Sequence, residues 1–207
     1  MKRLWNNAAA LVMLLAAGCL TSFTDENTEP DALDLSVSEN MAVPAVPQKA
    51  KAYVRSAMDQ VRRHLTKGGM SVTSTREGEV LEITVPCSEL FAPSSTELKP
   101  AAATLLKPLG IIVRDPGRYK LLITVHTDDT GDDQYADSIT AERANALDDF
   151  LWTLAGETDT NTIPYGLGRD EPLGPNNSIP SRAANRRVEF IVVPDKDMLR
   201  AAGVKIK

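Results

Sequence analysis

Apolar side chains begin to recur at a regular interval from Lys49 onward. The apolar positions lie three or four residues apart, as on one face of an α-helix. They are Tyr53, Val54, Met58, Val61 and Leu65. Gly68-Gly69 follows the last of them and is typical of a helix end. We therefore predict an amphipathic helix that ends at Gly68.

Two runs of strand-type residues come next, over residues 70–75 and 79–85. Arg76-Glu77-Gly78 joins them, and a short polar connection with glycine is typical of a hairpin. After a loop at 86–97, a second helical pattern runs from Leu98 to Ile112. Pro108 falls inside this pattern, where proline costs roughly 3 kcal/mol. We therefore expect the helix to bend or break there.

The second half of the chain alternates strand and helix patterns. Strand-type runs occupy residues 119–125, 162–167 and 188–193. Between the first two runs, Ile139-Thr140 is expected to open a third helix, with Thr140 as its N-cap. The glycine, proline and asparagine residues of 168–180 predict a loop. Residues 195–207 are interpreted as a short polar appendage, for which a single helical turn is the alternative to an irregular tail.

A carboxylate and a guanidinium flank the connection between the 119–125 strand and the third helix. Asp128 and Arg143 are 15 residues apart, and Arg143 is expected in the first turn of the helix. Charges held this way can bind a small zwitterion, whose anionic end a helix N-terminus favours. The same pair is also typical of a structural salt bridge. The acidic loop with His126 is an alternative metal site, but its spacing matches neither an EF-hand nor a zinc pattern.

Charge and cysteine content narrow the function classes. The totals of 23 basic and 28 acidic residues include two bases at the extreme N-terminus and six acids within 20–48. Residues 49–207 therefore hold 21 basic and 22 acidic residues, and this near neutrality argues against a nucleic-acid partner. Cys87 is interpreted as a small buried residue rather than a catalytic thiol. No cofactor or metal is predicted.

The N-terminus has the pattern of an export signal. Lys2 and Arg3 precede a short apolar run, and Ala16-Ala17-Gly18-Cys19 then supplies small residues before a cysteine. This resembles a bacterial lipobox, although Ala16 occupies a position where leucine is preferred. The resemblance implies that Cys19 is lipidated and anchors the chain in a membrane. An ordinary signal sequence cleaved after Ala17 or Gly18 is the alternative.

The order of elements and five short motifs resemble the C-terminal OmpA-like domain, over residues 79–193. The motifs are Leu90-Phe91 with Ser95 and Leu98; His126-Thr127-Asp128 with Gly131; Arg143-Ala144; Tyr165-Gly166-Leu167-Gly168; and Arg182 with Asn185-Arg186-Arg187-Val188-Glu189. The resemblance implies an α+β fold, a βαβαββ sandwich with helices on one face of a mixed sheet. An N-terminal helix and a hairpin strand would precede it.

The same resemblance implies a ligand. In that family an aspartate and an arginine hold the diaminopimelate of the peptidoglycan stem peptide, and Asp128 and Arg143 match those positions. Thr130 and Tyr135 match positions that line the pocket, and Arg186 lies on the strand approach. Ala136 stands where the family commonly has asparagine, which removes one hydrogen bond worth about 1 kcal/mol. Val125 replaces a usual glycine.

Together these features predict a non-enzymatic outer-membrane lipoprotein that binds peptidoglycan. Its expected parts are a signal peptide (1–19), a disordered acidic tether (20–48), a helix with a hairpin strand (49–78), an OmpA-like domain (79–194) and an appendage (195–207). One alternative is an envelope assembly protein that binds another protein through its 50–66 helix. A second is a metal-assisted hydrolase that uses His126 and the acidic loop.

Overall fold

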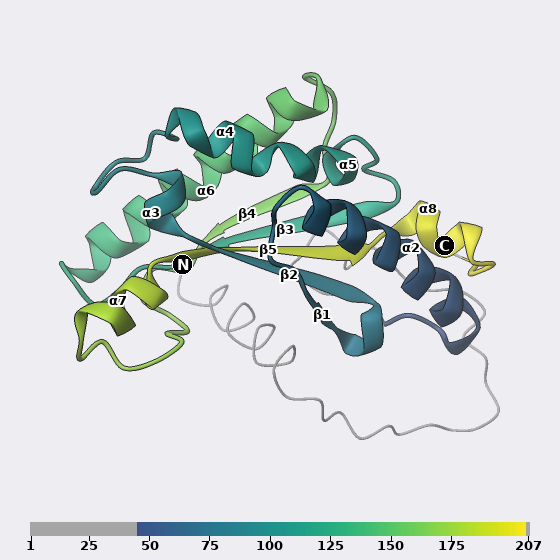
Figure 1. Cartoon of the computed structure of the whole chain (residues 1–207), viewed down its shortest axis with the longest axis horizontal. Coiled ribbons are helices and arrows are strands. Elements are labelled where there is room, and N and C mark those ends of the chain that lie inside the picture. The colour runs from purple at the N-terminus through teal and green to yellow at the C-terminus, as the bar shows by residue number, and fades with distance from the viewer. Residues whose placement is uncertain (1–44, 206–207) are drawn as a thin grey trace.

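A five-stranded mixed sheet organises residues 45–205, which are the residues that the computed structural model describes (Figure 1). The strand order is β1-β2-β5-β3-β4, with β3 parallel to β4 and the other neighbours antiparallel. The strands are β1 Thr73–Thr75, β2 Val80–Pro86, β3 Tyr119–Val125, β4 Thr162–Gly166 and β5 Arg187–Pro194. The expected α+β class is confirmed. The signal sequence, Cys19 and most of the expected tether lie outside the described residues.

The long helices pack on one face of this sheet (Figure 1). They are α2 Gln48–Lys67, the broken run of α4 Pro100–Leu106, η3 Lys107–Leu109 and α5 Gly110–Val113, and α6 Asp133–Ala155. Pro108 lies in the 3₁₀ turn between α4 and α5, which confirms the expected break. No helix within residues 45–205 combines the length and apolar character needed to cross a membrane.

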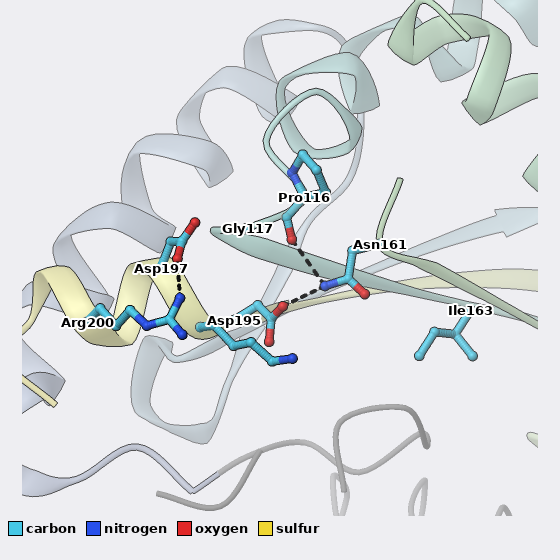
Figure 2. A pocket seen from close by; sticks show the side chains of 8 residues that line it. Pro116, Gly117, Asn161, Ile163, Asp195, Asp197 and Arg200 are labelled. Atoms are coloured by element: carbon cyan, nitrogen blue, oxygen red, sulfur yellow. Dashed lines mark hydrogen bonds and ion pairs between the residues drawn. The ribbon is translucent and has the colours of Figure 1, made fainter. Parts of the chain in front are cut away.

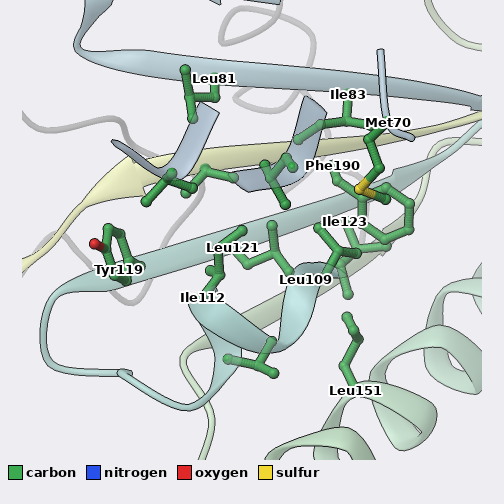
Figure 3. Packing of buried hydrophobic residues seen from close by; sticks show 14 of the residues in the cluster. Met70, Leu81, Ile83, Leu109, Ile112, Tyr119, Leu121, Ile123, Leu151 and Phe190 are labelled. Atoms are coloured by element: carbon green, nitrogen blue, oxygen red, sulfur yellow. The ribbon is translucent and has the colours of Figure 1, made fainter. Parts of the chain in front are cut away.

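One hydrophobic core lies between the sheet and these helices. Alternate residues of β3, such as Leu121 and Ile123, point toward Leu109 of η3 and Leu151 of α6, as Figure 3 shows. The α2 stripe predicted from the sequence enters the same core, except that Tyr53 is largely exposed. The opposite face of the sheet carries a smaller apolar cluster.

The crossover from β3 through α6 to β4 requires a close approach of helix and strand. A Cβ atom at Gly166 would lie 2.2 Å from the backbone nitrogen of Ala141, so only glycine fits at this position of β4. The helix ends at Gly156, which adopts a left-handed conformation as its C-cap. The Tyr165-Gly166 motif is therefore a packing feature of the α6–β4 contact.

The third helix begins earlier than the sequence predicts. Asp132, not Thr140, is the N-cap, and its side chain accepts a hydrogen bond from the Tyr135 nitrogen at 2.7 Å. Thr140 is buried within α6, where its hydroxyl donates to the Ala136 carbonyl and accepts from the Gly168 nitrogen. Arg143 is therefore about three turns into the helix rather than in its first turn.

Three further helices lie in regions that the sequence patterns assign to loops or tails. They are α3 Cys87–Leu90, α7 Ile179–Asn185 and α8 Lys196–Ala201. Met198 and Leu199 of α8 are fully buried in the main core, and Val204 follows them. Residues 195–205 are therefore part of the packed structure rather than a polar appendage.

Candidate ligand-binding site

A cavity of about 460 Å³ opens at the end of the sheet where β2 and β3 end and β5 begins. All five residues that the sequence suggests as ligand-binding residues lie in its wall. The lining residues are Cys87, Ser88, Phe91, Ala92, Pro93, Ser94, Lys99, Thr127, Asp128, Thr130, Tyr135, Ile139, Arg143 and Arg186. They come from segments up to 99 residues apart, so the fold assembles this site.

Asp128 provides the carboxylate of the site. Its side chain follows β3 directly and is only 3% exposed. Oδ1 accepts a hydrogen bond from the Thr130 nitrogen at 3.1 Å, and Oδ2 forms an ion pair with Arg186. Burial alone raises the pKa of Asp128, but the hydrogen bonds from Thr130 and Arg186 outweigh it and hold the pKa below its ordinary value. Asp128 is therefore ionised at neutral pH.

Arg143 provides the buried cation. The residue is 6% exposed. Its guanidinium donates from Nε to the Ser95 carbonyl at 2.9 Å, and weakly from Nη2 to the Ala92 carbonyl at 3.5 Å. The Phe91 ring lies 4.9 Å from its central carbon, within cation–π range. Among residues 45–205 no carboxylate forms an ion pair with Arg143. The structural salt bridge with Asp128, which was the alternative interpretation, is absent from this part of the chain.

The loop between β3 and α6 shapes the mouth of the cavity. Gly131 adopts a positive φ of 90°, and a Cβ atom there would lie 3.2 Å from the ring of Tyr135. Tyr135 lies in the first turn of α6 with 45% of its surface exposed, so its ring is available to a ligand. The Thr127 nitrogen donates to the Gly168 carbonyl at 2.8 Å, which fixes the start of the loop.

Neither of the two residues that depart from the family pattern lines the cavity. Ala136 is fully buried and is not among the residues that line the cavity. Val125 packs in the main core. Phe91 and Lys99 also line the cavity, and the sequence pattern indicates no ligand role for either residue. Phe91 belongs to one of the matched motifs, whereas nothing around Lys99 in the sequence indicates its position.

His126 has a structural environment instead of a metal site. Its ring nitrogens lie 3.2 Å from the Asp170 carbonyl and 3.3 Å from the Thr124 hydroxyl, and Nε2 is 3.7 Å from Glu189. No group of three or more His, Cys, Asp or Glu side chains in residues 45–205 has an arrangement suited to a metal ion. Of the acidic residues after His126, Asp128 lies in the cavity wall, Asp132 caps α6, and Asp129 and Asp133 are exposed.

A second cavity of about 550 Å³ lies at the opposite end of the sheet (Figure 2). The Asn161 amide bridges the Pro116 carbonyl and Asp195, and Arg200 pairs with Asp197 at 2.7 Å. The Asn161 contacts join the segment before β3 to Asp195, the N-cap of α8, as Figure 2 shows. The polar groups of the second cavity therefore bind mainly one another, whereas the first cavity contains a buried arginine that has no carboxylate partner within residues 45–205.

Comparison with known proteins matches residues 90–186 to the OmpA family model. YiaD of Escherichia coli K12, named as a lipoprotein, is 29% identical over 61% of this chain and 57% of its own length, which is less than two thirds. A MotB-like protein from Desulfovibrio vulgaris is 27% identical with a TM-score of 0.60, covering 71% of this chain and 97% of the other. The cell wall anchor of the T6SS from Pseudomonas aeruginosa is 25% identical with a TM-score of 0.55, covering 66% and 97%.

Proposed function

Residues 90–186 form an OmpA family domain, and from this premise we propose that the protein is a non-catalytic binder of bacterial peptidoglycan. The ligand group would be the diaminopimelate of the stem peptide. The observation that carries this proposal is the environment of Arg143, a buried cation that shares a cavity with Asp128 but has no carboxylate partner in residues 45–205. A buried charge without a counter-ion is costly, so the site favours an anionic ligand.

The free end of diaminopimelate matches the chemistry of the two residues. It is an amino-acid head group with one ammonium and one carboxylate. Arg143 uses Nε for the Ser95 carbonyl, and its remaining donors can bind a carboxylate. The ionised Asp128 would accept from the ammonium. Arg186 already pairs with Asp128, and as its side chain is 41% exposed it can share that carboxylate with the ligand or turn toward solvent.

Two similarities support a location in the cell envelope. YiaD is named as a lipoprotein, and one similar solved structure is a cell wall anchor. Together with the lipobox-like sequence at Cys19, these names support a lipid-anchored protein whose domain lies in the periplasm and binds the wall. Anchoring in the outer membrane remains part of the proposal, and Cys19 lies outside the described residues.

The cavity also favours binding over catalysis. Cys87 lines it, but burial raises the pKa of this thiol, an effect that the nearby Arg143 and Arg186 only partly offset. The thiolate needed for nucleophilic attack is therefore disfavoured. The alternative of a partner-binding helix at 50–66 cannot use the apolar stripe of α2, because Val54 and Leu65 of that stripe are buried in the protein's own core.

A sedimentation assay with purified sacculi tests the proposal. The full chain is expected to pellet with the sacculi, and Arg143→Ala or Asp128→Asn is expected to weaken binding at least about tenfold, because each removes a charge-assisted hydrogen bond. Arg200→Ala and Asp149→Asn are matched controls, since both residues are exposed and outside the cavity. If both site variants pellet like the unaltered chain, the proposed site is wrong.

A further inference from the structure

The charges around the ligand cavity do not balance. Its wall contains one acidic side chain, Asp128, and three basic side chains, Lys99, Arg143 and Arg186. Arg186 neutralises Asp128 through their ion pair. Arg143 and Lys99 then remain, and neither forms an ion pair with a carboxylate of residues 45–205. A zwitterion alone has no net charge, so it would leave this excess of positive charge uncompensated.

Lys99 is held in place by the surrounding backbone. Its backbone nitrogen donates to the Leu90 carbonyl at 2.8 Å, and its ammonium donates to the Ser88 carbonyl at 2.5 Å. It immediately precedes Pro100, the first residue of α4, and is extended there, with ψ at 147°. A lysine ammonium has three N–H donors, so the bond to Ser88 leaves two for a ligand. Lys99 is thus a positioned, half-buried cation in the cavity wall.

We propose that Lys99 binds a second carboxylate of the same stem peptide, in addition to the head group bound by Asp128 and Arg143. This inference rests on the proposed function. The cavity would then distinguish stem peptides with a free second carboxylate from those in which that group is amidated. Amidation removes the negative charge and replaces an acceptor oxygen with an N–H₂ group, which an ammonium cannot use as a partner.

Two synthetic peptides provide the probe. Both are L-Ala-γ-D-Glu-meso-diaminopimelate in which the diaminopimelate carboxyl beside the peptide bond is capped as an amide. They differ only in whether the α-carboxyl of the glutamate, the second carboxylate assigned to Lys99, is free or amidated. The full chain is expected to bind the free acid on the order of fivefold more tightly, as is typical of a partly exposed charge pair. The preference is expected to decrease at high ionic strength, because salt screens this contact.

Substitution of Lys99 tests its role directly. Lys99→Gln is expected to bind both peptides with the affinity that the unaltered chain has for the amidated one. Lys99→Arg keeps the charge and is expected to retain the preference. Lys107→Gln is the matched control, because Lys107 is exposed on η3 and does not line the cavity.

The outcomes separate this inference from the function on which it rests. Equal affinity of the unaltered chain for both peptides would overturn the inference, while the loss of both in Arg143→Ala would leave the proposed function intact. Failure of the chain to bind either peptide would overturn the proposed function itself. If Lys99→Gln weakens both peptides equally, Lys99 acts only by holding the Ser88 carbonyl, and the inference is wrong.

Discussion

At the scale of single residues, the partners of Asp128 and Arg143 come from far along the chain. Asp128 pairs with Arg186, which is 58 residues away, and Arg143 donates to the carbonyls of Ser95 and Ala92, which are 48 and 51 residues away. The family resemblance was enough to select Asp128 and Arg143 from the sequence. It could not indicate that Arg143 lacks a carboxylate partner among residues 45–205, because that depends on which backbone carbonyls the fold brings near it.

A second cluster of charged residues also joins positions that are far apart in the sequence. Its members are His126, Arg187 and Glu189. Glu189 of β5 accepts from Arg187 Nε at 2.6 Å and lies 3.7 Å from His126. Burial alone raises the pKa of Glu189, but the nearby His126 ring and the Arg187 guanidinium outweigh it and lower the pKa to about 2. Arg187 Nη2 also donates to the Glu171 carbonyl, so this group connects β5 to the loop after β4.

The lowered pKa of Glu189 predicts acid-dependent stability. The folded-state pKa of about 2 is below the ordinary value of 4.5, so the ionised carboxylate stabilises the fold above pH 4.5. This contribution, about 3 kcal/mol, is lost as the pH falls from 4.5 through 2. Glu189→Gln is expected to lower the free energy of unfolding at pH 7 and to flatten its decrease in acid, as measured by urea denaturation at several pH values.

The control for this experiment is Glu89→Gln, because Glu89 is exposed on α3. Its acid dependence should match that of the unaltered chain. Glu171 has the opposite sign, since burial raises its pKa, and it contributes a decrease in stability as the pH rises. An unchanged pH profile for Glu189→Gln would show that the pairing of Glu189 with Arg187 and His126 does not stabilise the fold.

At the scale of elements, periodicity located the strands and long helices but not every helix boundary. The alternation in β3 and the stripe in α2 are strong local signals, and Pro108 marked a real break. The sequence predicts the start of α6 at Thr140, because threonine is a common N-cap. Asp132 takes that role, while Thr140 contacts Gly168 of a distant loop, and such a tertiary contact leaves no periodic signal.

The contact of α6 with β4 gives a prediction for Gly166. Gly166→Ala is expected to destabilise the fold by at least about 1 to 3 kcal/mol, because the new methyl group would meet backbone atoms of Thr140 and Ala141 that cannot move independently. Equilibrium chemical denaturation measures the change. Gly174→Ala is the matched control, since nothing lies within 4 Å of a Cβ there. Equal stability of the two variants would contradict the close approach.

At the scale of the whole molecule, the ligand cavity and the ends of the described chain lie at opposite ends of the sheet. β2 begins beside Glu79, which Lys51 of α2 approaches at 3.5 Å, and ends at Pro86 beside the cavity-lining Cys87. β5 runs from the cavity to α8. Seven residues of strand, roughly 23 Å, therefore separate the cavity from the contact of Lys51 with Glu79.

The sequence pattern did not indicate that α8 completes the core. Only six residues form this helix, and its two apolar positions, Met198 and Leu199, are too few to establish a period. Their burial depends on α2, which packs nearby although it lies more than 130 residues earlier. A core formed from both ends of the described chain explains why neither end can be interpreted as an independent appendage.

Because α8 completes the core away from the ligand cavity, a substitution in α8 should change the stability of the fold without changing its affinity for the ligand. Leu199→Ala is expected to lower the free energy of unfolding by about 2 to 5 kcal/mol, because it leaves a cavity where a fully buried side chain packed. Peptide affinity, measured at low temperature where the variant is folded, should be unchanged, since Leu199 is at the end of the sheet opposite the ligand cavity. Lys196→Ala, on the exposed side of α8, should change neither quantity. A loss of affinity in folded Leu199→Ala would mean that the two ends of the sheet are coupled.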